Sequence, residues 1–460
     1  MMLLLADRFA RVSAPLAPQR ARPWPAAVLA GGFAAFYTWF VLMQHWSYRT
    51  GAFDLGIFDQ ALRSYAHGHL PVSTIRDPQL ILLGDHFHPI LAVLAPVYRL
   101  FPMAETLLVA QALFFAASIY PITRLACTTL GPRIGVVIGV CYGFSWGLLH
   151  AITFDFHEIA FAVPLLAFAL VEFLQGRAGR AVAIAAPLVL VKEDLGLTLA
   201  VLGFLIALRP ATRRLGVWTA VGGTAASLLS VLVIVPAFSA YDNYRYFGKG
   251  GLQGAEPALN GAMFSLDKLW LVALLLLPTL FVALRSPLVL LLLPTLAWRL
   301  GSTNVLYWIP SFHYDAVLMP IVFCAMIHGL TLLRPHLVGR RRRLLLPLFA
   351  AGLSVVCFSF FLQSAIPKGP GKPAEFAAAA DRLVNRIPAN ATVSTTGTIA
   401  PHLTSKADVY QLKDNQPTEW TLAPYDDPEL RYRLADLVIR DDDLVLMHHP
   451  APTLPPLRGR

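Results

Sequence analysis

The polar segments of this 460-residue chain are sorted by charge. About eleven apolar stretches divide the sequence, and the polar segments between them alternate between two kinds. One kind is short and rich in arginine. The other kind holds most of the acids, histidines and tyrosines, in segments 53–60, 84–89, 154–158, 192–194 and 312–315. If the apolar stretches cross a membrane, all five of these segments lie at one surface.

The composition supports membrane crossing. Hydrophobic residues make up 56% of the chain and charged residues only 14%, whereas soluble domains have about a quarter of their residues charged. Apolar runs of about 17–25 residues are typical of membrane helices. The expected spans are 25–44, 103–122, 134–151, 158–175, 181–191, 195–208, 215–236, 270–284, 287–300, 315–333 and 344–364. Several are short, and the fifth and sixth could form one helix broken by Lys192-Glu193-Asp194.

Arginines set the expected orientation, because loops rich in Lys and Arg stay in the cytoplasm. Four arginines precede the first stretch, so residues 1–24 are predicted to be a cytoplasmic tail and 25–364 the membrane domain. If the fifth and sixth stretches formed a single span, every later arginine-rich loop would lie on the outer side of the membrane. We therefore expect two separate spans. The net charge of +10 then reflects arginines beside anionic lipid and not a nucleic-acid partner. The prediction is a multipass protein of a bacterial plasma membrane.

Two outer regions are large enough to carry structure of their own. The first outer loop, 45–102, contains an amphipathic helical pattern at 54–67 and an apolar stretch at 90–100 that is too short to span a membrane. After a Pro- and Gly-rich linker at 367–373, the sequence becomes polar. We expect residues 365–460 to form an extracytoplasmic α/β domain. Its predicted elements are a helix at 374–386 and strands at 391–396, 407–411, 435–439 and 443–447.

The five outer segments, in this order, resemble an uncharacterised bacterial and archaeal family of predicted membrane proteins, known as a domain of unknown function. This resemblance covers roughly residues 25–330. The layout also resembles the C-type (GT-C) glycosyltransferase superfamily, in which a long first outer loop carries an acid soon after the first helix. The resemblance implies an all-α polytopic membrane protein with about eleven spans and an outer C-terminal domain. It also implies an integral membrane glycosyltransferase that takes its sugar from a polyprenyl-phosphate donor. The acceptor would be a glycan, lipid or protein of the cell envelope.

The resemblance places Asp54 at the position of the catalytic acid of the first loop. Leu55 follows it, so the adjacent acid pair of the superfamily is absent, and Asp59 is the second candidate. A carboxylate there would accept the proton of the acceptor hydroxyl. The leaving phosphate needs cations or hydrogen-bond donors. The candidates for substrate or phosphate binding are Lys192, Glu193, Arg245, Arg299, His313 and Tyr314.

A second set of outer residues consists of ligand types for metals. This possible metal or acceptor site comprises Asp85, His86, His88, Asp155, His157 and Glu158. The two-residue spacing of His86 and His88 is not a strong metal motif. No cofactor is therefore predicted outright, and a divalent metal stays an open alternative.

Structural roles compete with these assignments. Asp54 could cap the first-loop helix, Glu158 could interact with a helix dipole, and Arg299 could extend from a helix end to the headgroups. Lys192 and Glu193 could form an ion pair in a broken helix. For the whole chain, the alternative functions are a transporter or flippase for a lipid-linked or small solute, and an assembly protein. The sequence shows no inverted repeat of the kind common in transporters.

Overall fold

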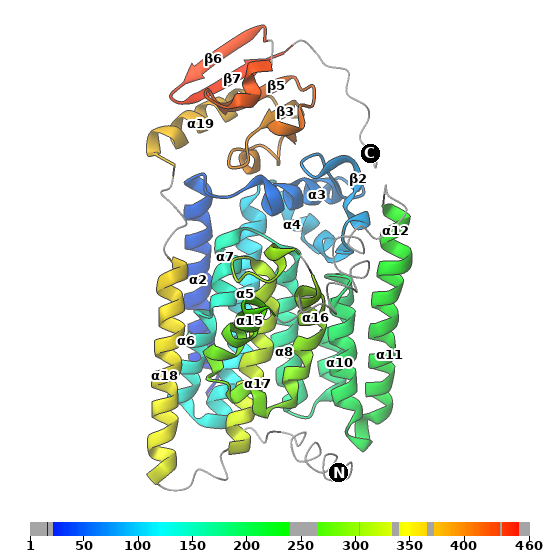
Figure 1. Cartoon of the computed structure of the whole chain (residues 1–460), viewed down its shortest axis with the longest axis vertical. Coiled ribbons are helices and arrows are strands. Elements are labelled where there is room, and N and C mark those ends of the chain that lie inside the picture. Colours follow the sequence, from blue (N-terminus) through cyan, green and yellow to red (C-terminus); the bar gives the residue numbers. More distant parts are fainter. Residues whose placement is uncertain are drawn as a thin grey trace.

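The computed structural model describes residues 16, 22–239, 265–302, 304–333, 340–365, 372–432 and 435–449. It shows a bundle of roughly parallel and antiparallel helices with a small sheet-containing domain at one end (Figure 1). Most of the segment between the expected spans 215–236 and 270–284, and most of the linker at 367–373, lie outside the described residues.

Within the described residues, five segments are long and apolar enough to cross a membrane. They contain α2 (Trp24–Trp46), α5 (Glu105–Leu130), α6 with α7 (Pro132–Gly143 and Trp146–Phe154), α11 with α12 (Arg213–Leu229 and Val235–Phe238) and α17 (Met319–Leu333). The other helices of the bundle are α8 (Ala162–Leu174), α9 (Ala178–Ala185), α10 (Leu195–Ala207), α15 (Leu266–Leu276), α16 (Leu293–Gly301) and α18 (Arg340–Ala365). Every predicted apolar stretch thus contains helix, and the fifth and sixth are separate. The number of eleven spans stays a prediction.

Helices α10 and α11 pack closely against each other. A Cβ atom added to Gly203 would lie 2.4 Å from the backbone N of Ala220, and one added to Gly216 would lie 2.2 Å from the backbone N of Ala207. Membrane helices commonly approach through small residues in this way. The two backbones are therefore close enough that only glycine fits at either position.

We expect Gly216→Leu to lower the stability of the bundle by about 1–3 kcal/mol or more, because the larger side chain forces α10 and α11 apart. Thermal unfolding of the purified chain measures this loss. Gly222→Leu on the same helix is the matched control, since a Cβ there meets nothing within 4 Å. Equal unfolding temperatures for the two variants would contradict this packing.

The first loop carries more structure than the sequence predicted. The helix expected at 54–67 is α3 (Ile57–Ala66), which begins later because Phe53 and Asp54 have non-helical backbone angles. A hairpin of β1 (Val72–Ser73) and β2 (Asp77–Ile81) follows, and it was not predicted. The short apolar segment at 90–100 ends in α4 (Ala95–Leu100).

The C-terminal domain is the predicted small α/β unit. Helix α19 (Ala374–Arg386) has the predicted bounds, and the four predicted strands are present. The strands are β3 (Thr392–Thr395), β4 (Asp408–Gln411), β5 (Trp420–Pro424), β6 (Leu437–Asp441) and β7 (Leu444–His448), in the order β4-β3-β5-β7-β6. β3 is parallel to β4 and β5, whereas β7 is antiparallel to β5 and β6. The central strand β5, which ends in Pro424, was not predicted.

This domain packs on the end of the bundle that holds the first loop (Figure 1). The Tyr48 hydroxyl, just after α2, donates to Asp381 at 2.6 Å. The Arg63 guanidinium on α3 donates to the Ala407 carbonyl at 2.9 Å and to Asn390 at 2.9 Å. The first loop and the C-terminal domain therefore share one side of the bundle, as the sequence predicted. Which side faces the cytoplasm stays a prediction.

Candidate functional site

Three side chains from three of the five polar segments converge beneath the first loop. The Nδ1 atom of His313 lies 3.7 Å from Oδ2 of Asp54. The ring of His313 stacks on that of His157, with centroids 3.4 Å apart and planes at 21°. One ligand atom from each of the three residues lies within 4.8 Å of the others. Asp54 is partly exposed, and both histidines are buried.

Ion pairs join the other two segments to this cluster. The Nδ1 atom of His157 lies 2.7 Å from Glu158, whose other carboxylate oxygen accepts from Lys192 at 2.9 Å. Glu193 pairs with His86 at 2.7 Å and accepts from the Phe87 amide at 3.0 Å. Lys192 thus binds Glu158 rather than its neighbour Glu193. All five predicted segments meet, as the charge sorting indicated.

Strained backbone holds two of the acids. Asp54 has φ 63° and ψ −79°, and Asp155 has φ 104°. Such conformations cost about 1–3 kcal/mol each outside glycine and gather at functional sites. The Asp155 carboxylate accepts from the Gly51 amide at 2.8 Å, which ties the loop to the end of α7. Asp54 does not cap α3, whose N-cap is Gly56 without a side-chain cap.

Sequence analysis overlooked Gln111, a fully buried polar residue on α5. Its amide nitrogen donates to the Asp155 carbonyl at 2.7 Å, and its oxygen accepts from the His157 amide at 3.1 Å. Gln111 therefore fixes the backbone that presents His157. In the sequence, a glutamine inside the apolar stretch 103–122 could have indicated a buried polar contact.

Asp54 is suited to accept a proton. Burial raises the pKa of this carboxyl group above its ordinary value, opposed by the positive charges of His157 and Lys192. A general base works best when its pKa approaches the operating pH. The raised pKa therefore makes Asp54 a stronger base than an exposed aspartate.

Arg299 has partners that were not expected. The guanidinium is fully buried and donates to both carboxylate oxygens of Asp315, at 2.6 and 3.2 Å, and to the Tyr307 carbonyl at 2.6 Å. It also lies 5.6 Å from the ring centroid of Tyr314, which in turn packs beside His313. Its hydrogen bonds favour a structural role over phosphate binding, and it does not extend to the headgroups.

The remaining predicted residues occupy different places. Asp85 pairs with Arg76 at 2.8 Å. His88 is buried with its ring 5.4 Å from that of Phe58, and burial lowers its pKa. Of the six residues predicted for a metal or acceptor, only His157 belongs to the three-residue cluster. Arg245 lies outside the described residues.

Asp59 lies in a different environment from Asp54. It is fully buried, and the Tyr98 hydroxyl donates to it at 2.8 Å. Burial raises the pKa of Asp59 to about 7, although hydrogen bonds from Thr404 and Tyr98 and the charge of Arg63 act in the opposite direction. Thr404 belongs to the C-terminal domain. Asp59 is thus placed at the contact between that domain and the first loop.

This burial predicts a pH-dependent stability. The folded-state pKa of Asp59, about 7, exceeds the unfolded value of 3.8. The protonated Asp59 carboxyl group therefore contributes its full share to the free energy of unfolding below about pH 4. This share is lost as the pH rises to about 7, by up to about 1.4 kcal/mol per pH unit. Asp59→Asn should remove this part of the dependence in thermal unfolding between pH 4 and 8. An unchanged pH profile in the variant would contradict the assignment.

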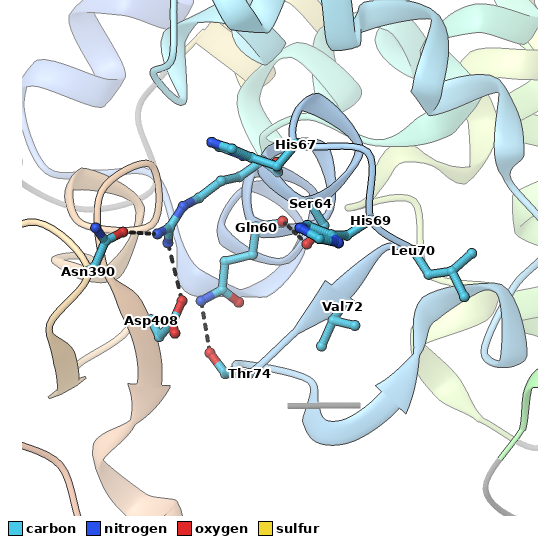
Figure 2. A pocket seen from close by; sticks show the side chains of 10 residues that line it. Gln60, Ser64, His67, His69, Leu70, Val72, Thr74, Asn390 and Asp408 are labelled. Atoms are coloured by element: carbon cyan, nitrogen blue, oxygen red, sulfur yellow. Dashed lines mark hydrogen bonds and ion pairs between the residues drawn. The ribbon is translucent and has the colours of Figure 1, made fainter. Parts of the chain in front are cut away.

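A small polar hollow separates α3 from the C-terminal domain (Figure 2). Its volume is about 230 Å³, below the range of roughly 300–1,000 Å³ for ligand pockets. Arg63 on α3 donates to Asn390 at 2.9 Å and to Asp408 at 3.2 Å. In Figure 2, Gln60 bonds to Thr74. These side chains bind one another across the contact, so the hollow belongs to the docking surface of the domain.

Comparison with known proteins identifies the family. The model of the predicted membrane protein family DUF2079 matches residues 44–439. The chain belongs to this family. The match begins at the end of α2 and spans the first loop, the other helices of the bundle and most of the C-terminal domain of this DUF2079 protein. No curated protein matches it.

The fold of this DUF2079 protein is similar to that of solved structures. A crystal structure of ArnT from Cupriavidus metallidurans bound to undecaprenyl phosphate matches with a TM-score of 0.55 at 16% identity, covering 92% of this chain and 97% of that one. The apo state of the same protein matches with a TM-score of 0.49 at 15% identity, covering 91% and 98%. The first of these similarities shows that this chain shares its overall fold with ArnT over nearly the whole length of both chains.

Proposed function

We propose that this protein is an integral membrane glycosyltransferase that takes a sugar from a polyprenyl-phosphate donor and transfers it to a cell-envelope acceptor. The observation that carries this proposal is the convergence of Asp54, the histidine pair and Lys192 beneath the first loop, within a fold shared with ArnT. The ArnT structure holds undecaprenyl phosphate, a lipid of the kind that the proposed donor would leave behind after transfer of its sugar.

In this proposal Asp54 accepts the proton of the acceptor hydroxyl as the new glycosidic bond forms. Its carboxylate is partly exposed, so an acceptor can reach it, while its surroundings raise its pKa. The transition state carries positive charge on the sugar, as in related glycoside chemistry. A carboxylate beside the sugar also stabilises that charge.

The cations for the departing phosphate are Lys192 and His86. Lys192 is buried, and its ammonium group binds one oxygen of Glu158. His86 is partly exposed. Burial lowers its pKa, but the charge and hydrogen bond of Glu193 together with the charge of Asp85 outweigh burial, so the pKa of His86 is raised. Both groups lie close enough to Asp54 to lower its pKa. A phosphate bound by both would therefore lie beside the base.

The C-terminal domain covers the first loop from outside the bundle. The Lys413 ammonium lies 5.4 Å from the ring centroid of Phe53, the residue before Asp54. We propose that this domain shields the site and guides the acceptor to it.

A deletion strain of the source bacterium tests the proposal in cells. Without the transferase, its unused polyprenyl-phosphate sugar should accumulate, and the native chain should return it to the normal level. Mass spectrometry of extracted lipids measures the pool. Unchanged lipid-linked sugars in the deletion strain would contradict a transferase that consumes them.

A further inference from the structure

The three-residue cluster has the composition of a metal site. Asp54, His157 and His313 offer one carboxylate oxygen and two imidazole nitrogens, all within 4.8 Å of one another. They come from the first loop, the end of α7 and the segment before α17. Imidazole ligands favour zinc and similar transition metals over magnesium and calcium, which prefer oxygen ligands.

His313 gives an independent indication of a missing ligand. Its side chain is 4% exposed, and neither ring nitrogen has a hydrogen-bond partner among the residues that the structure describes. A buried polar group without a partner costs about 1–3 kcal/mol. Since the ring lies beside Asp54 and against His157, a bound ion would satisfy a nitrogen that nothing else in the described structure satisfies.

His157 is held as metal-binding histidines usually are. Its Nδ1 lies 2.7 Å from Glu158, and Lys192 holds Glu158 in turn. A carboxylate on one imidazole nitrogen orients the ring and makes the other nitrogen a better ligand. Gln111 adds a hydrogen bond to the His157 backbone.

We propose that Asp54, His157 and His313 bind one divalent transition-metal ion of the zinc type. Three protein ligands leave one position open in a tetrahedral site, as in catalytic zinc sites. Bonds of about 2.0–2.2 Å need ligand atoms about 3.3 Å apart, so the ligands move inward on binding. Asp54 can make this movement, because it is partly exposed and lies outside regular helix. The His157 and His313 rings are stacked with planes at 21°, so one ring must also rotate until its nitrogen points at the ion.

An ion at this cluster would lie beside the proposed base, and only this consequence rests on the proposed function. It would bind one oxygen of Asp54 and lower the pKa of that carboxyl group, so the second oxygen would accept a proton as a weaker base than in the metal-free chain. Metal binding itself does not depend on which reaction the protein catalyses.

Metal content and spectroscopy of the full chain test the site without any donor. Purified protein in lipid nanodiscs is stripped with a chelator and titrated with Zn²⁺, and with Co²⁺ as a visible probe. The native chain should bind one ion, give the absorption of tetrahedral Co²⁺ and unfold at a higher temperature with metal. His313→Ala and Asp54→Asn should each weaken binding more than tenfold.

His328→Gln is the matched control, since His328 is a buried histidine of α17 that contacts Ser286 at 2.9 Å. It should bind metal as the native chain does. A native chain that takes up neither ion would overturn the inference, even if the ligand variants do not fold. Equal affinity in native protein and in folded His313→Ala would also overturn it.

Discussion

Asp54→Asn should lower the rate of sugar transfer by about two to four orders of magnitude, the usual contribution of a positioned general base. The amide keeps the shape of the carboxyl group but cannot accept a proton from the acceptor. It also removes the negative charge opposite His313, 3.7 Å away. Initial rates of purified native and variant protein, at equal amounts of folded chain, measure the change.

Asp77→Asn is a suitable control, because Asp77 lies in β2 of the same outer loop. Its rate should match that of the native chain. Near-native transfer by Asp54→Asn, together with a large loss in Asp59→Asn, would instead assign the base to Asp59.

Arg299→Met should destabilise the folded protein by about 3–5 kcal/mol, the typical cost of removing one partner from a buried ion pair. Asp315 is 1% exposed, so its carboxylate would be left charged and without its two hydrogen bonds. Thermal unfolding in detergent measures the loss. The double variant Arg299→Met/Asp315→Leu should recover much of it, because no unpaired charge then remains.

The same variant tests whether Arg299 also binds phosphate. A structural role predicts that surviving Arg299→Met protein keeps the native KM for the lipid donor. If its stability is native and its KM is much higher, the phosphate-binding role expected from the sequence is correct and the structural role is wrong.

The bilayer explains why so much of this site could be predicted. Apolar stretches must cross the membrane as helices, so the polar segments between them can meet only at its two faces. That constraint alone placed Asp54, Glu158, Lys192 and His313 at one surface, and the structure connects them. The bounds of α19 followed separately, from the helical pattern of its sequence.

The details that depend on tertiary contacts were not predictable. The sequence predicted Asp54 and Asp59 in one helix, whereas Asp54 lies before α3 in non-helical backbone and only Asp59 lies within α3. Only the fold places Thr404 against Asp59. The pairing of Arg299 with Asp315 joins residues from two helical segments. The stacking of His157 on His313 likewise joins segments that are distant in sequence.

Turnover of polyprenyl-phosphate sugars by the purified native chain in lipid nanodiscs is the most direct test. A panel of donors is supplied with an envelope extract as the source of acceptors, and mass spectrometry follows the lipids. The account predicts that one donor releases polyprenyl phosphate while its sugar appears on an acceptor. If no donor is consumed, and proteoliposomes instead show protein-dependent movement of lipid-linked sugar across the bilayer, the protein is a transporter and the account is wrong.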